Sequence, residues 1–268
     1  MQFGSFDVDT RHLSWDGLDV IGETPLEQAA SLCERSMSTL FFLGSGLSQE
    51  SGLATFRGER GGVYTEDVMH FTHSETFRKD PASQLAWHRQ WLARIEQARP
   101  NKGHHALARM IGSSRASHII VTQNVDTLLE QSLQAHRLPH TVHHIHGDLH
   151  QTRGHARDCP SGLSWKDADR CGHCDQWLRP DVVWFGEELD AQQVEQIRLA
   201  AMRCDVCVLV GTSGVVYPAA ALPELAQASG ARLIEINTHE TLMTSKCDVV
   251  IRDMAGPALT LLESLCAH

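Results

Sequence analysis

Three short motifs rich in glycine and polar residues follow one another along this chain. Gly44-Ser45-Gly46-Leu47-Ser48 is a glycine turn, in which a phosphate could contact backbone N–H groups. Thr122-Gln123-Asn124-Val125-Asp126 places polar side chains directly after an apolar segment, and His146-Gly147-Asp148 places a titratable imidazole before a glycine. Each motif is weak evidence alone. In this order they predict an enzyme that binds a dinucleotide and performs acid–base chemistry at its sugar.

The segments that must position these motifs alternate between two patterns. Apolar, partly β-branched runs predict strands at Thr39–Leu43, His118–Thr122, Thr141–Ile145, Val206–Val210, Leu233–Ile236 and Val249–Ile251. Helical patterns occupy Pro25–Arg35, Pro81–Gln97, Ala106–Met110, Asp126–Gln134, Ala191–Met202, Ala219–Ala228 and Pro257–Cys266. This alternation predicts an α/β fold, a Rossmann-like doubly wound parallel sheet with its ligand at the carboxyl ends of the strands.

One region interrupts the alternation. Residues 151–179 are polar, show no clear period and contain Cys159, Cys171 and Cys174. We expect a small inserted module that is held by something other than a hydrophobic core. The predicted organisation is an N-terminal arm over residues 1–24, a dinucleotide-binding domain over 25–150 and 180–268, and this module.

Composition narrows the class of protein. The 268 residues are 42% hydrophobic, which is ample for a full core. The net charge of −10 argues against nucleic acid as a partner, because binding to phosphates requires clustered Lys and Arg. An acidic surface suits a lysine-rich substrate, although acidity is also common among proteins that are merely soluble. No apolar run is long enough to span a membrane and no signal peptide is evident, so we expect a cytoplasmic protein.

With six motifs in order, the chain resembles the sirtuin family of NAD-dependent protein deacylases, from about residue 30 to the end. Besides the three motifs above, the resemblance includes Ser51-Gly52 and Phe56-Arg57 after the glycine turn. It continues through Val183-Trp184-Phe185-Gly186-Glu187, Gly211-Thr212-Ser213 and Glu235-Ile236-Asn237. The desuccinylase-like subgroup is the most similar.

The resemblance implies an NAD site. Gly44, Ser45, Gly46, Phe56 and Arg57 would line and cover the NAD pocket. The ribose and adenosine contacts would come from Gly211, Thr212, Ser213 and Asn237. Gln123 would touch the nicotinamide ribose, Asn124 would hold that ribose and a water molecule, and Asp126 would bind the nicotinamide amide.

The resemblance also implies a reaction. The acyl oxygen of the substrate attacks the ribose carbon as nicotinamide leaves. His146, with Asn124 beside it, is the catalytic residue: it takes a proton from a ribose hydroxyl, which closes on the acyl carbon, and the product is O-acyl-ADP-ribose. Imidazole suits this step because its ordinary pKa lies near neutrality. Val183, Trp184, Phe185 and Gly186 would hold the substrate peptide by strand pairing.

The small module departs from the family pattern. Sirtuins usually carry two cysteine pairs that bind a structural zinc. Here Cys171-Gly-His-Cys174 matches the second pair, whereas the first is missing and Cys159 and His155 lie close by. Three interpretations stay open: zinc bound by His155 or another side chain with the three cysteines, a zinc-ribbon-like module that has lost its metal, or a partial site.

The acyl pocket is a second departure. The similar subgroup places a Tyr and an Arg three residues apart on the helix after Asp80-Pro81, where they bind the acyl carboxylate. This chain has His88 and Trp91 at those positions. A buried succinyl carboxylate would lack a partner, so we expect neutral acyl groups to be preferred. The alternative is that Trp87, His88 and Trp91 only fill the core.

Three functions remain from the sequence. The leading hypothesis is an NAD-dependent lysine deacylase that acts on an acylated protein or peptide. A mono-ADP-ribosyltransferase or NAD hydrolase on the same scaffold needs Asn124 and Asp126 but not His146. A non-catalytic sensor of NAD or ADP-ribose would need no base at all. The oligomeric state is not predicted.

Overall fold

The computed structural model describes residues 22–55, 66–153, 163–215 and 217–266. The predicted N-terminal arm lies almost entirely outside these residues.

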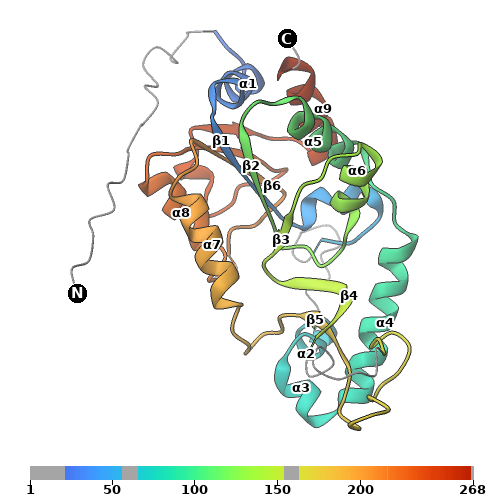
Figure 1. Cartoon of the computed structure of the whole chain (residues 1–268). Coiled ribbons are helices and arrows are strands. Elements are labelled where there is room, and N and C mark those ends of the chain that lie inside the picture. Colours follow the sequence, from blue (N-terminus) through green and yellow to red (C-terminus); the bar gives the residue numbers. More distant parts are fainter. Residues whose placement is uncertain (1–21, 56–65, 154–162, 216, 267–268) are drawn as a thin grey trace, which may run out of the picture.

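Eight strands and nine α-helices make up the described part of the chain (Figure 1). The strands are β1 (Ser38–Leu43), β2 (Ser117–Thr122), β3 (Val142–His144), β4 (Gly147–Arg153), β5 (Arg179–Val182), β6 (Val206–Val210), β7 (Arg232–Ile236) and β8 (Val249–Ile251). The helices are α1 (Pro25–Arg35), α2 (Glu66–Phe71), α3 (Ser74–Lys79), α4 (Pro81–Gln97), α5 (Lys102–Ser113), α6 (Leu128–Ala135), α7 (Ala191–Ala201), α8 (Ala221–Ala228) and α9 (Ala255–Cys266).

The main sheet has six parallel strands in the order β3-β2-β1-β6-β7-β8. The chain builds the sheet outward from β1 in one direction through β2 and β3, and then in the other direction from β6 to β8. Such a reversal opens a crevice beside the carboxyl ends of the two central strands, which is where doubly wound sheets bind ligands. The predicted Rossmann-like fold class is confirmed.

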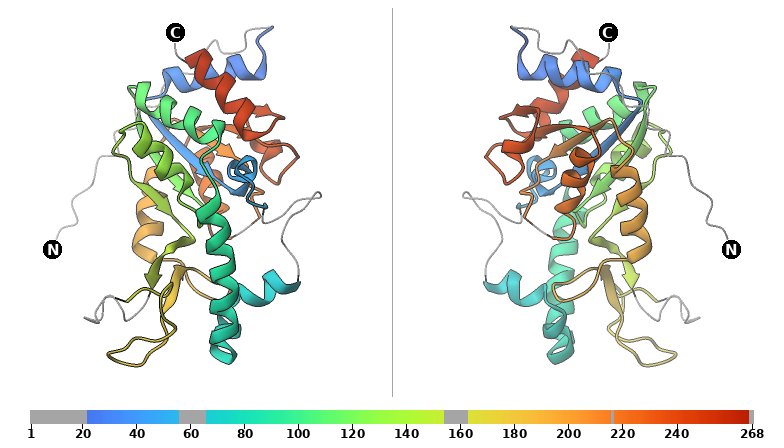
Figure 2. Two further views of the ribbon diagram at one scale, coloured as in Figure 1. Left: turned by 90° about the vertical axis from the view of Figure 1, so that its right-hand side faces the viewer. Right: turned by 90° about the vertical axis from the view of Figure 1, so that its left-hand side faces the viewer.

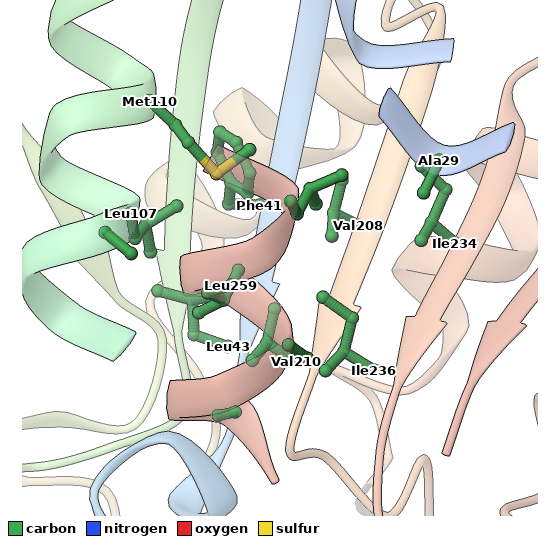
Figure 3. Close-up of a cluster of buried hydrophobic side chains, with 14 of the residues drawn as sticks. Ala29, Phe41, Leu43, Leu107, Met110, Val208, Val210, Ile234, Ile236 and Leu259 are labelled. Atoms are coloured by element: carbon green, nitrogen blue, oxygen red, sulfur yellow. The ribbon is translucent and has the colours of Figure 1, made fainter. Parts of the chain in front are cut away.

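Helices cover both faces of this sheet (Figures 1 and 2). Side chains from α1, α5, α6 and α9 pack on one face, and side chains from α7 and α8 pack on the other. Figure 3 shows the first of these clusters, in which Leu107, Met110 and Leu259 lie against Phe41 and Val210 of the central strands. The central strands are apolar on both faces because both faces are covered.

A smaller part of the molecule lies beyond the carboxyl ends of the sheet. It contains α2, α3, α4 and the antiparallel pair of β4 and β5 (Figure 1). A separate cluster of buried side chains joins α4, β4 and the inserted module. Trp165, Cys171 and Leu178 of the module are each no more than 1% exposed in this cluster. The expectation of a module without a hydrophobic core is therefore corrected.

The module shares that core with its neighbours, which is why its own sequence shows no apolar period. Trp165 donates from its indole Nε1 to the carbonyl of Leu149 on β4 (3.2 Å). Arg89 of α4 donates to the carbonyl of Trp165 (2.6 Å) and pairs with Asp169 (2.7 Å). The predicted module boundary after residue 150 lies inside β4.

Some helix ends differ from the prediction for local reasons. The helix expected at Ala106–Met110 begins at Lys102, because the Asn101 side chain accepts from the backbone N–H groups of Gly103 and His104. The helix expected from Asp126 begins at Leu128, because the Asp126 carboxylate accepts from the Leu128 N–H (3.1 Å). Within the described residues no helix combines the length and apolarity needed to cross a membrane.

Candidate functional site

The glycine turn after β1 lies against the turn after β6. A Cβ on Gly44 would lie 2.6 Å from the Gly211 carbonyl oxygen, and one on Gly46 would lie 2.6 Å from the Gly211 Cα. Gly211 itself has a φ of +58°. Because side chains are excluded on both sides, the two turns approach through backbone alone. Half-buried Ser45 and buried Ser48 follow in this turn.

The polar residues after β2 form a chain of hydrogen bonds with this turn. The Asn124 amide donates from Nδ2 to the Gly44 carbonyl (3.1 Å) and to Ser48 Oγ (3.3 Å). Ser48 in turn donates to the carboxylate of Asp126 (2.9 Å). The arrangement fixes the amide of Asn124 and the carboxylate of Asp126 at one edge of the crevice.

Asp126 is a carboxylate held in a buried position. Its side chain is 8% exposed, and burial raises its pKa above the ordinary value. The hydrogen bonds from the Leu128 N–H and from Ser48 Oγ oppose that shift, because they stabilise the ionised form.

His146 lies just past β3, next to the same segment. Its Nδ1 contacts the carbonyl of Gln123 (3.1 Å), so Nδ1 carries the proton and Nε2 is left as the basic nitrogen. Burial lowers the pKa of this imidazole, partly offset by the bond to Gln123. A neutral imidazole near pH 7 with a fixed tautomer is suited to general-base chemistry.

The turn after β6 joins the polar segment to the strand beyond it. Gln123 donates from Nε2 to Thr212 Oγ1 (2.7 Å), and Asn237 donates from Nδ2 to the Thr212 carbonyl (2.8 Å). Ser213 follows in the same turn. The structure therefore brings together residues from the ends of β1, β2, β3, β6 and β7.

The predicted substrate segment lies beside His146. The Val183 N–H donates to the His146 carbonyl (2.9 Å). Phe185 pairs with residues 72–74 through the bonds Phe185 N–H to Thr72 carbonyl (2.8 Å) and Ser74 N–H to Phe185 carbonyl (3.0 Å). Val183 and Phe185 are half-buried and Gly186 is exposed, whereas Trp184 is 3% exposed and packs inward.

His88 and Trp91 lie on α4, close to Trp184. The Trp184 indole donates from Nε1 to Nε2 of His88 (3.0 Å), while His88 Nδ1 contacts the Gln84 carbonyl (2.9 Å). Burial lowers the pKa of His88 to about 4, so it is neutral. Trp91 is half-buried, and its ring lies 5.7 Å from that of Trp87.

Four predicted site residues lie outside the described part of the chain: Phe56, Arg57, His155 and Cys159. Cys171 is buried and Cys174 is exposed in one turn of the module. Among the described residues no group of three or more His, Cys, Asp or Glu side chains is arranged to hold a metal.

Three supporting residues received no role in the sequence analysis, although Ser48 belongs to the first motif. Ser48 links Asn124 to Asp126. Asn101 donates from Nδ2 to the Leu47 carbonyl (2.8 Å), and the Glu50 carboxylate accepts from the Gly256 N–H (2.6 Å). Only Asn101 left a signal, as a capping residue before a helix. The other two act through contacts that are distant in the sequence.

Comparison with known proteins identifies the family. Residues 44–218 match the Sir2 family. The chain is also 34% identical over 256 residues to the NAD-dependent protein deacylase of Corynebacterium glutamicum, covering 90% of this chain and 95% of the relative. The chain belongs to the Sir2 family. The resemblance stated from the motifs is confirmed.

Solved Sir2 structures share this architecture. A Sir2 homologue in complex with NAD is 31% identical and has a TM-score of 0.77, covering 89% of this chain and 93% of that chain. A Sir2 structure with a p53 peptide and NAD+ is 25% identical with a TM-score of 0.73, covering 87% of this chain and 95% of that one. The polar crevice described above therefore lies in a fold that binds NAD in this family.

Proposed function

We propose that this Sir2 chain is an NAD-dependent protein lysine deacylase that releases nicotinamide and O-acyl-ADP-ribose and prefers neutral acyl groups to succinyl. The observation that carries the proposal is the convergence of Asn124, Asp126 and a neutral His146 at the switch point of the sheet. The name of the Corynebacterium relative and the NAD bound to a Sir2 homologue support NAD-dependent deacylation as the general activity.

Each group of the crevice has a part in this proposal. The Gly44 to Gly46 turn and Ser45 would bind the phosphates, with Phe56 and Arg57 as cover. Gly211, Thr212, Ser213 and Asn237 would bind the ribose and adenosine side. Asn124 and Gln123 would hold the nicotinamide ribose, and Asp126 would bind the nicotinamide amide.

His146 would complete the reaction as the general base. Its Nδ1 proton is committed to the Gln123 carbonyl, so Nε2 is free to take a proton from a ribose hydroxyl. The hydroxyl oxygen would then attack the acyl carbon, which is already joined to the ribose through the acyl oxygen. The lysine amine would leave from that carbon, and a water molecule would supply the oxygen that completes O-acyl-ADP-ribose. A transferase or hydrolase that stops at ADP-ribose would not need this proton transfer.

The substrate would be an acylated protein or peptide, laid along Val183 to Gly186. We expect the peptide to pair with this segment as an added strand. The p53 peptide in a Sir2 structure supports a peptide partner.

The preference for neutral acyl groups rests on α4. Neither ring nitrogen of His88 has a proton to offer to a carboxylate, because Nε2 accepts from Trp184 and Nδ1 donates to Gln84. The Arg89 guanidinium is engaged by Trp165 and Asp169 of the module. Arg179 stacks on Trp184 and pairs with Glu187 (2.6 Å). A succinyl carboxylate beside His88 would therefore lose water and meet guanidinium groups that are already paired with Asp169 and Glu187.

The test uses purified protein, NAD and a set of peptides with acetyl, butyryl, long-chain, lactyl or succinyl lysine, with all products read by mass spectrometry. O-acyl-ADP-ribose from a neutral acyl peptide is the expected result. Succinyl as the best substrate would overturn the interpretation of α4. ADP-ribosylated peptide, or free ADP-ribose with the acyl group intact, would replace deacylation by transfer or hydrolysis, and NAD binding without turnover would indicate a sensor.

Zinc binding by the module stays a prediction. A structural zinc site needs four protein ligands, and the described residues contribute only the two thiols of Cys171 and Cys174. A complete site would require Cys159 together with His155 or another side chain, and both Cys159 and His155 lie outside the described residues. Metal analysis of the purified protein, compared with a Cys171→Ser variant, decides this: one zinc per chain that the substitution removes would support the site.

A further inference from the structure

We propose that His144 is a second functional histidine of this site: a positioning residue that, as an imidazolium, clamps the main-chain carbonyl of Asn124 to Glu130 on α6. The inference rests on the role of Asn124 proposed above. It assigns a task to a histidine that the motifs do not single out.

The geometry of His144 requires a proton on each ring nitrogen. Nδ1 lies 3.0 Å from the carbonyl oxygen of Asn124, and Nε2 forms an ion pair with the Glu130 carboxylate. Both partners are acceptors only, so a neutral imidazole could satisfy just one of them. The His144 side chain is 12% exposed and that of Glu130 is 33% exposed, so the histidine end of the pair is the better shielded from water.

The surrounding charges favour the same protonation state. Burial disfavours the charged ring, but the hydrogen bond and charge of Glu130, the bond to Asn124 and the charge of Asp148 on β4 together raise the pKa of His144. The pKa of the neighbouring His143 is lowered, mainly by burial and also by the charge of His144. The charge of His144 also lowers the pKa of Asp126, because it favours the ionised carboxylate.

The two histidines of this strand end therefore work as a complementary pair. His144 and His146 are two residues apart and hold the adjacent carbonyls of Asn124 and Gln123. One must be charged to keep both of its bonds, and the other must be neutral to accept a proton. Activity should rise as His146 loses its proton and fall at higher pH as His144 loses its own.

The experiment compares wild type with Glu130→Gln and His144→Asn. Histidine 15N NMR titration of the full-length protein follows the protonation of each ring, and the His144→Asn spectrum identifies the His144 signals. Deacylation rates are then measured across the same pH range. The Glu130→Gln change removes the paired charge, so the pKa of His144 and the alkaline limb of the rate profile should fall together by about one unit.

The His144→Asn variant provides a second test of the proposal. The Asn amide can still donate to the Asn124 carbonyl but cannot titrate, so activity should persist without the alkaline limb that His144 causes. Glu263→Gln is the matched control, since it breaks the exposed pair with Arg109 (2.8 Å) without touching the site, and should leave the profile unchanged.

The proposal is overturned if the His144 titration is the same in Glu130→Gln, or if the alkaline limb stays in place when that titration moves. The NMR titration measures protonation of the histidine rings and does not depend on enzyme turnover. An inactive wild type with the expected His144 titration would therefore count against the proposed function and in favour of the clamp itself. Thermal melts of all variants distinguish a lost fold from a lost clamp.

Discussion

At the scale of single residues, the site depends on hydrogen bonds that set protonation states. Asp126 is buried but bonded by Ser48 and a backbone N–H, and His146 has one nitrogen committed to a carbonyl. The three motifs were enough to predict Gln123, Asn124, Asp126 and His146 as a group, because strand ends of a parallel sheet meet at one edge. Which carbonyl each histidine faces could not be predicted, since that depends on the geometry of β3.

Replacing His146 with Ala tests the base directly. Acyl transfer should fall by about 10²–10⁴-fold, the usual contribution of a general base. NAD binding, measured by calorimetry, should change little. His143→Ala is the control from the same strand, and a variant without His146 that still formed O-acyl-ADP-ribose would refute the mechanism.

Replacing Ser48 with Ala tests the support of Asp126. The pKa of Asp126 is already raised by burial. The hydrogen bond from Ser48 lowers that pKa, so losing this bond should raise it further. The ionisation of Asp126 should therefore move to higher pH. The part of the acid limb of kcat/KM for NAD that Asp126 adds to that of His146 should move with it, and KM for NAD should rise. Steady-state kinetics between pH 5 and 8 measure both. An unchanged acid limb would show that Ser48 does not influence Asp126.

At the scale of elements, α4 holds the smaller part of the molecule together. Its buried face packs on Trp184 and on the module, and Arg89 contacts the Trp165 backbone. The helix itself was predicted with its observed bounds, Pro81–Gln97. The β4 and β5 pair was not predicted, because short polar strands outside the main sheet carry no apolar alternation. The helices α2 and α3 were not predicted, because six residues are too few to show a clear helical period.

The packing of Trp165 predicts its energetic importance. This indole is fully buried, and Trp165→Ala should cost about 3–5 kcal/mol of the free energy of unfolding, measured in urea. Trp177→Ala, in the same module but only partly buried, is the matched control and should cost less. Equal losses in the two variants would show that Trp165 does not anchor the module.

At the scale of the whole molecule, several histidines are buried without charge. Burial lowers the pKa of His88 and of His104 to about 4. The unfolded chain binds these protons more readily, at an ordinary pKa near 6.5, so stability should fall as the pH falls from about 6.5 to 4. Each group contributes up to about 3 kcal/mol over that window.

Urea unfolding at pH 7, 6, 5 and 4.5 measures this dependence. His88→Gln keeps an acceptor for the Trp184 indole but cannot titrate, so the slope of stability against pH should be shallower by up to one proton. A slope identical to that of wild type would show that His88 does not titrate on unfolding.

The hydrogen bond from the Val183 N–H to the His146 carbonyl connects the proposed peptide-binding segment directly to the base. It fixes the spacing between His146 and the segment proposed to bind the peptide, and this spacing does not depend on the acyl group. The backbone of the proposed substrate lysine would therefore lie at a fixed distance from His146. In the proposed function we expect added acyl carbons to extend toward α4. The rings of Trp87 and Trp91 on that helix, and not Asn124 or Asp126, should then set the preference for acyl chain length.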